Sequence, residues 1–199
     1  MLPPRSPSIV LPIGDHTWIS LSRRQWILFT GVATVAFWIA LGIIERSLPS
    51  GAPGIIEFEF VRNAHRTARF LAEWGADGRA TVRLSLIVDY GFMVSYGAFV
   101  TLAGLATRDF GREHGLRALA SAGRVVPWFA TAAAVFDAGE NAFLLWTVGG
   151  DGGSAAPVLA TVCSIVKWVL IVTAVGYVLW GLVARLQAVK SGSQQNADS

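Results

Sequence analysis

Three polar side chains interrupt an apolar segment of the chain, in the stretch FDAGENAFLLW at residues 136–146. Asp137, Glu140 and Asn141 stand at positions i, i+3 and i+4, so a helix carries all three on one face. A charged side chain in such a segment costs about 2.5–3.5 kcal/mol on the membrane-insertion scale. Carboxyl groups kept at that cost can act as general acid or base, or bind a proton, a cation or a basic ligand.

Two other apolar segments carry charged residues that we expect to face this triad, namely Asp89 and Lys167. Counting inward from the segment ends at about 1.5 Å per residue places all the charged residues at similar depths. The sequence therefore predicts one polar site shared by three helices. Neutral polar side chains on the same helical stripes complete it: Tyr96 and Ser85 beside Asp89, and Ser164 beside Lys167.

The predicted site contains more acid than base. The carboxyls of Asp89, Asp137 and Glu140 face only the ammonium of Lys167, so the site is net negative if every group is ionised. An apolar environment does not tolerate uncompensated charge. Either at least one acid holds a proton at neutral pH, or a cation or basic ligand completes the site.

Three interpretations of this pocket stay open. In the leading one, a small membrane protein binds a proton, a cation or a lipid-like ligand in a buried acidic pocket. In the second, Glu140 or Asp137 is the general acid or base of a membrane-embedded enzyme that acts on an isoprenoid- or lipid-like substrate. In the third, the protein is a non-catalytic structural subunit whose polar cluster fixes the register of its helices. The binding residues of the first interpretation are Asp89, Asn141, Lys167, Tyr96, Ser85 and Ser164.

The composition of the chain indicates a membrane protein. Its 199 residues are 53% hydrophobic and only 15% charged, whereas a soluble domain has about 25% charged residues. Four apolar segments approach or exceed the roughly 20 residues needed to cross a bilayer. They cover residues 25–44, 84–106, 125–148 and 158–184. We therefore expect an all-α protein, an integral membrane four-helix transmembrane bundle that forms one domain over residues 25–185, with flexible tails at 1–24 and 186–199.

The stretch EFEFVRNAHRTARFLAEW, between the first two apolar segments, has a helical pattern. Apolar and small residues recur every three or four positions, and arginines recur on the opposite side. This pattern predicts an additional amphipathic helix at residues 57–74. Such a helix lies in the lipid headgroup layer or caps the bundle, and the alternative is a lid over a site that opens on that side.

The basic residues predict the orientation. They stand before the first apolar segment, between the second and third, and after the fourth, whereas the loop GGDGGSAAP at residues 149–157 has none. The positive-inside rule then places both termini in the cytoplasm, and we expect the protein in a bacterial cytoplasmic membrane. The arginines between the first two segments oppose this assignment.

No motif in the sequence identifies a cofactor. His16, His65 and His114 lack the spacing of metal ligands, so we predict no metal site. Arginines that flank apolar segments are typical of topology signals and lipid contacts rather than of nucleic-acid binding. The expected partners are the lipid bilayer and a lipid-like small molecule, and the chain could also form a homo-oligomer or join a membrane complex.

Overall fold

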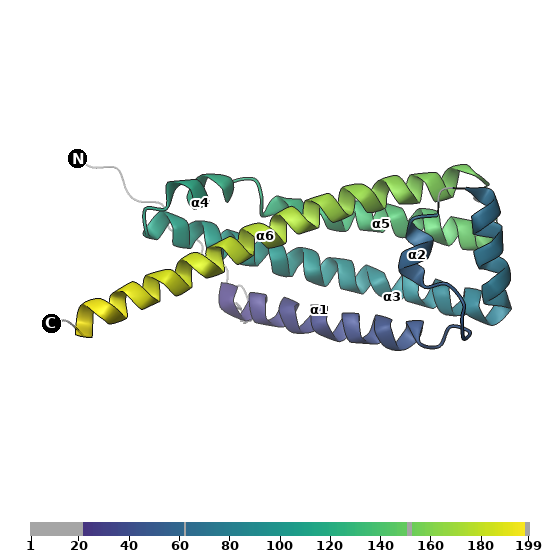
Figure 1. Cartoon of the computed structure of the whole chain (residues 1–199), viewed down its shortest axis with the longest axis horizontal. Coiled ribbons are helices and arrows are strands. Elements are labelled where there is room, and N and C mark those ends of the chain that lie inside the picture. The colour runs from purple at the N-terminus through teal and green to yellow at the C-terminus, as the bar shows by residue number, and fades with distance from the viewer. Residues whose placement is uncertain (1–21, 62, 151–152, 198–199) are drawn as a thin grey trace, which may run out of the picture.

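Every regular element of the described chain is a helix. The computed structural model describes residues 22–61, 63–150 and 153–197. Four long helices run along the length of the molecule, whereas the second helix and the beginning of the third cross one of its ends (Figure 1). The elements are α1 (Arg23–Glu45), α2 (Ile55–Glu59), α3 (Ala64–Glu113), α4 (Arg117–Ala122), α5 (Trp128–Gly149) and α6 (Ala155–Ala197).

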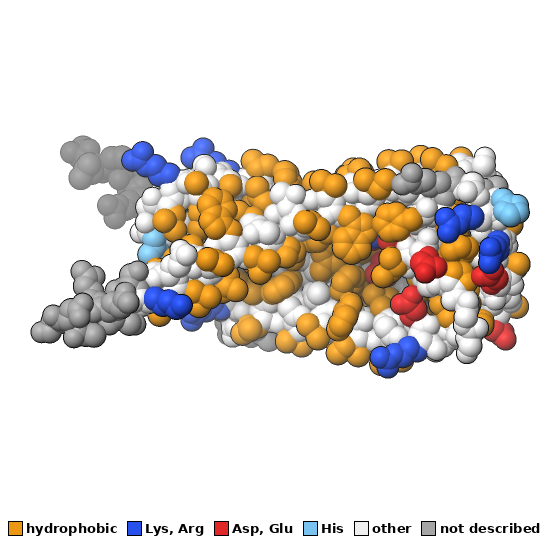
Figure 2. All heavy atoms as spheres, viewed as in Figure 1, with side chains coloured by type: hydrophobic (Ala, Val, Ile, Leu, Met, Phe, Trp, Pro, Cys, Tyr) orange, Lys and Arg blue, Asp and Glu red, His pale blue; other side chains and the backbone are white. Residues whose placement is uncertain are grey.

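Three of the described helices are long and apolar enough to cross a membrane. The candidate spans are Arg23–Glu45, His65–Glu113 and Ala155–Lys190. Hydrophobic side chains are spread over the face seen in Figure 2, and Trp38 in α1 and Val94 in α3 are 67% and 73% exposed. The fourth predicted segment corresponds to α5, which carries Asp137, Glu140 and Asn141 and is not among these spans.

Glycines in α3 allow its neighbours to approach closely. A Cβ atom at Gly91 would lie 2.4 Å from the ring of Phe37 in α1, and one at Gly97 would lie 3.0 Å from Cβ of Ala134 in α5. Contacts of this kind are typical of helices that associate through small residues. The helices α1 and α5 therefore both lie directly against α3.

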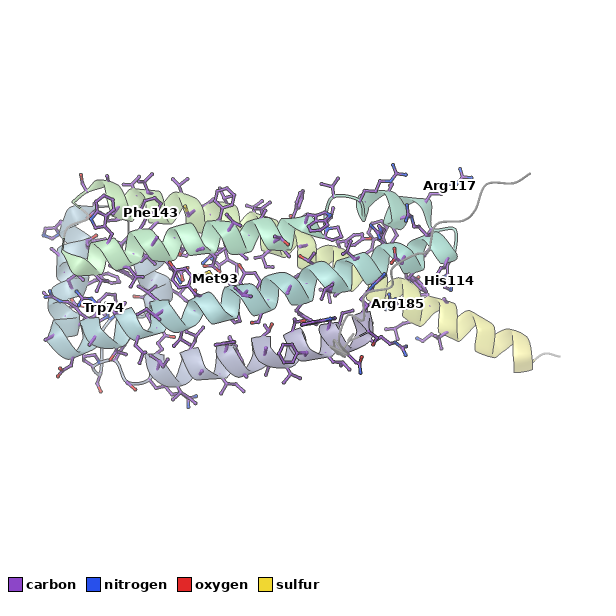
Figure 3. The ribbon with its side chains drawn as sticks, turned by 180° about the vertical axis from the view of Figure 1, so that it is seen from behind. Trp74, Met93, His114, Arg117, Phe143 and Arg185 are labelled. Atoms are coloured by element: carbon purple, nitrogen blue, oxygen red, sulfur yellow. The ribbon has the colours of Figure 1, made fainter. Side chains whose placement is uncertain are left out.

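One end of the bundle is closed by α2 and the first part of α3. The long helix α3 bends at Gly75, whose φ of 61° and ψ of −161° are accessible to glycine but strained for other residues. Just before the bend, Trp74 is 1% exposed and packs against Phe58 and Phe70. Its indole nitrogen donates to the carbonyl of Pro53 at 2.8 Å. Figure 3 shows Trp74 at this capped end, with His114 and Arg185 at the other end.

The structure divides the predicted amphipathic helix of residues 57–74 in two. The first part is α2, which ends at Glu59, and the second part begins α3 at Ala64. The break is stabilised by Asn63, whose side chain accepts a hydrogen bond from the backbone N–H of Arg66 at 2.8 Å and so caps the new helix. The prediction of a single helix was wrong because this capping signal was not recognised.

Other helix ends also differ from the predicted ones. The helix predicted to begin at residue 84 begins at Ala64, and the one predicted to end at residue 184 continues to Ala197, into the predicted tail. The guanidinium of Arg185 donates to the carbonyl of Ala106 in α3 at 2.8 Å, which ties the extended α6 to the bundle. Of the predicted N-terminal tail, residues 1–21 lie outside the described residues.

Candidate functional site

The ammonium group of Lys167 in α6 lies among three carboxylates. Its Nζ is 2.7 Å from Oε2 of Glu140 and 3.0 Å from Oδ1 of Asp137, both on α5. The third carboxylate, that of Glu59 in α2, has its Oε2 atom 3.5 Å away. The side chain of Lys167 is 10% exposed and that of Glu140 is fully buried. The structure thus brings the predicted lysine together with both acids of the α5 face.

Asp137 is held from two sides. Its Oδ1 atom accepts a hydrogen bond from Lys167 at 3.0 Å, and its Oδ2 atom accepts one from the hydroxyl of Tyr96 in α3 at 2.9 Å. Because Tyr96 is only 7% exposed, its hydroxyl has little access to solvent and donates to this carboxylate instead. Charge-assisted hydrogen bonds of this kind are stronger than neutral ones. Asp137 therefore joins α3, α5 and α6.

Asn141 fixes the position of Asp89. The amide nitrogen of Asn141 donates to Oδ2 of Asp89 at 2.8 Å and to the backbone carbonyl of Leu86 at 3.1 Å. Both amide hydrogens are used in this way, since an asparagine side chain has two. Among the described residues, no Lys, Arg or His nitrogen lies within 4.0 Å of Asp89. Asp89 is thus positioned by a neutral partner and has no ion-pair partner among the described residues.

The carboxylate of Glu140 is the most deeply buried acid of the site. Neither of its oxygens accepts a hydrogen bond of suitable geometry, although Oε2 lies 2.7 Å from Lys167. The carboxylate of Glu59 approaches the same ammonium group, with its Oε2 atom 3.5 Å from Nζ of Lys167.

Glu59 belongs to the site, and the sequence analysis missed it. The residue ends α2, and the hydroxyl of Thr161 donates to its backbone carbonyl at 3.1 Å. Its carboxylate accepts from Ser164 at 3.4 Å. Burial raises the pKa of the Glu59 carboxyl above its usual range, although the nearby Lys167 acts to lower it. A signal was present in EFEF, where an acid directly follows the buried Phe58.

A cavity of about 740 Å³ lies beside this cluster. Its walls come from α1, α2, α3, α5 and α6, and Figure 2 shows the corresponding hollow, with acidic side chains near the capped end. Polar residues line one part of it: Glu59, Ser85, Asp89, Tyr96, Asp137, Asn141 and Lys167. The larger part is apolar and includes Trp38, Ile39, Phe92, Phe99, Trp168 and Ile171. The cavity therefore has a charged part and a larger hydrophobic part.

The predicted site residues occupy different places relative to this cavity. Asp89, Asn141, Lys167, Tyr96 and Ser85 line it, as does Asp137. Glu140 and Ser164 are not among the lining residues and lie behind them, each 0% exposed. In the described part of the chain, no group of three or more His, Cys, Asp or Glu side chains could hold a metal ion.

The site has four carboxylates and one ammonium group. Lys167 contacts Glu59, Asp137 and Glu140, whereas among the described residues Asp89 is bound only by the amide of Asn141. No protein-family model, curated protein or solved structure matches this chain. Its function is therefore inferred from the geometry and the chemistry of the site.

Proposed function

We propose that this is an integral membrane protein whose cavity binds a lipid-like amphiphile. The observation that carries the proposal is the lining of the cavity, in which apolar side chains of α1, α3 and α6 adjoin a group of charged and polar residues. Ligand sites typically combine a mostly apolar lining with a few polar groups that fix orientation. An amphiphile matches both parts, with its chain against Phe99 and Ile171 and its head near Asp89.

Entry from the lipid phase is favoured by the position of α1. The cavity is bounded by α1 on one side and by Lys167, Trp168 and Ile171 of α6 on another. Trp38 and Ile39 of α1 are 67% and 52% exposed, so this wall belongs to the outer surface. A ligand dissolved in the bilayer would reach the polar site between α1 and α6 without crossing water.

In this proposal α5 is the fourth membrane-spanning helix. Its 22 residues are enough to cross the roughly 30 Å hydrocarbon core at 1.5 Å per residue. Asp137, Glu140 and Asn141 are each at most 4% exposed, so they face the interior of the protein and not lipid. The proposal includes cytoplasmic termini, which labelling from each side of the membrane would test. A cysteine at Arg66 that reacts only from the cytoplasm would contradict it.

The binding proposal can be tested by filling the cavity. Gly42 lines the cavity, and a Cβ atom added there would meet nothing within 4 Å, so Gly42→Trp places an indole in open space. Gly176 in α6 has equally free surroundings but does not line the cavity, which makes Gly176→Trp a matched control. The measurement is saturable binding of radiolabelled dodecanol to the purified full chain in nanodiscs.

We expect saturable binding to the wild type and to Gly176→Trp, and its loss in Gly42→Trp. Equal binding to all three proteins would mean that dodecanol dissolves in the surrounding lipid and does not occupy the cavity. Absence of binding to the wild type would leave the polar cluster as a purely structural element. The catalytic alternative gains no support from the site, because Glu140 does not line the cavity and both oxygens of Asp137 are already bound.

A further inference from the structure

Lys167, Tyr96 and Asn141 line the polar end of the cavity, and the hydrogen-bond donors of all three side chains are already used. Lys167 is surrounded by three carboxylates, and the hydroxyl of Tyr96 donates to Asp137. The amide nitrogen of Asn141 donates its two hydrogens to the backbone carbonyl of Leu86 and to Oδ2 of Asp89. An anionic head group placed here would find its natural partners engaged and would lie beside carboxylates. The polar end of the cavity is therefore unfavourable for a phosphate or a carboxylate.

Asp89, in contrast to these donors, is an acceptor that has no cationic partner within 4.0 Å among the described residues. It lines the cavity, and its Oδ2 atom accepts from Asn141. A carboxylate in a largely apolar cavity is costly unless it is paired and hydrogen-bonded. A ligand with a cationic head group would supply the partner that the Asp89 carboxylate lacks.

We propose that the head group of the bound amphiphile is a protonated amine that pairs with Asp89. This inference rests on the proposed function, since it names the chemistry of the ligand in the same cavity. An ammonium group has three donors and no acceptor, which suits a wall of oxygens. The alkyl chain would then lie along the hydrophobic wall formed by Phe92, Phe99 and Ile171.

Two further charged residues lie at the rim of the cavity. Glu45 and Arg46 also line it, at the end of α1. The carboxylate of Glu45 accepts a hydrogen bond from the backbone N–H of Ile55 at 3.1 Å, and Arg46 is exposed. The charges of Glu45 and Arg46 are opposite, so these two residues together add no net charge to the lining of the cavity. The excess of negative charge inside the cavity thus remains the feature that selects the head group.

The test compares three amphiphiles with the same twelve-carbon chain: dodecylamine, dodecanol and dodecyl phosphate. Each competes with radiolabelled dodecanol for the wild-type chain in nanodiscs, and Gly42→Trp defines binding outside the cavity. We expect dodecylamine to bind about tenfold or more tightly than dodecanol, which is the scale of one charge-assisted hydrogen bond. Dodecyl phosphate should bind most weakly of the three.

Asp89→Asn removes the charge and keeps the size of the side chain. We expect it to abolish the preference for dodecylamine, so that dodecylamine and dodecanol compete about equally well for the variant. Retained dodecanol binding also shows that the variant is folded. Asp77→Asn, at an exposed position of the same helix, controls for the general effect of charge on the partitioning of an amine. It should leave the preference intact.

The outcomes separate the two proposals. If dodecanol binds but dodecylamine has no advantage, or if Asp89→Asn leaves the advantage unchanged, the amine inference is wrong and the binding function stands. Tightest binding of dodecyl phosphate would also overturn the inference and would assign the head group to Arg46 or Lys167. If no amphiphile binds in a way that Gly42→Trp removes, the proposed function itself is wrong.

Discussion

The ammonium of Lys167 lies 2.7 Å from Oε2 of Glu140, a carboxylate with no exposed surface. The two residues come from α6 and α5, and Asp137 and Glu59 complete the shell around the same nitrogen. The lysine of α6 thus holds acids of two other helices, α2 and α5. This relationship explains how a largely apolar bundle can keep several carboxyl groups buried, and it makes Lys167 the residue on which the cluster depends.

Replacing Lys167 by methionine should strongly destabilise the protein at neutral pH. The side chain keeps a similar length and apolar stem, but Glu59, Asp137 and Glu140 lose their shared cation. Breaking a buried ion pair by removal of one partner costs about 3–5 kcal/mol. The measurement is thermal unfolding of the purified protein in detergent. At acid pH the loss should become smaller, because protonation neutralises the carboxylates, and an equal loss at every pH would contradict this account.

Glu59 should make the stability of the wild type depend on pH. Because burial raises its pKa in the folded protein above the ordinary value of 4.5, the folded state binds the proton more tightly than the unfolded chain does. The contribution of Glu59 to stability is then fully present below the ordinary pKa and is lost as the pH rises through the raised one. Glutamine cannot ionise, so Glu59→Gln should gain stability relative to the wild type over that range.

The check is the difference in unfolding free energy between Glu59→Gln and the wild type, followed from about pH 4 to about pH 8. Glu57→Gln, which removes an exposed carboxyl from the same helix, controls for the loss of one charge at this end. A difference that favours the wild type more strongly at high pH would show that Lys167 holds Glu59 in its ionised form.

The sequence predicted the α5 face of the site because helical spacing is a local property. Asp137, Glu140 and Asn141 share a face in any helix. Buried acids need a partner of opposite charge, and Lys167 is a lysine at similar depth on another apolar segment. Glu59 could not be found in this way. Its place depends on the break between α2 and α3 and on the contact of α2 with Thr161 in α6, which are tertiary features.

The extent of α3 was missed for a related reason. The predicted apolar segment began at residue 84, whereas the helix continues back through a polar stretch and bends at Gly75. Hydropathy reports which residues suit lipid, but it does not report where a helix begins. The start of α3 is set by the cap at Asn63 and by the packing of Trp74. The amphipathic pattern of residues 57–74 included Trp74, but the cap at Asn63 was not predicted.

The contact between α1 and α3 should be sensitive to a single methyl group. Gly91→Ala places a Cβ atom 2.4 Å from the ring of Phe37, so the ring or the helix must move. Overpacking of this kind costs about 1–3 kcal/mol. Gly176→Ala is the control, because its new methyl group meets nothing within 4 Å, and it should be neutral or slightly stabilising. Thermal unfolding of both variants provides the measurement, and equal stability would mean that α1 is not held against α3 at this point.

Glu140→Gln tests what the most buried acid of the site contributes. The substitution keeps the size of the side chain and removes one negative charge from a shell in which three carboxylates surround Lys167. A neutral amide is less costly to bury than a carboxylate, so stability should hold or rise by about 1 kcal/mol. Since Glu140 does not line the cavity, binding of dodecanol should stay within about twofold of the wild type.

The same variant separates ligand binding from proton chemistry. Asp137→Asn is the companion substitution, because Asp137 does line the cavity and accepts hydrogen bonds from Tyr96 and Lys167. We expect Asp137→Asn to weaken amphiphile binding and Glu140→Gln to leave it intact, measured on the same nanodisc preparations. A Glu140→Gln protein that folds and binds dodecanol normally, yet fails to support a cellular activity that the wild type supports, would show that Glu140 transfers a proton. The cavity would then be the active site of an enzyme or a proton-linked carrier, and ligand binding only its first step.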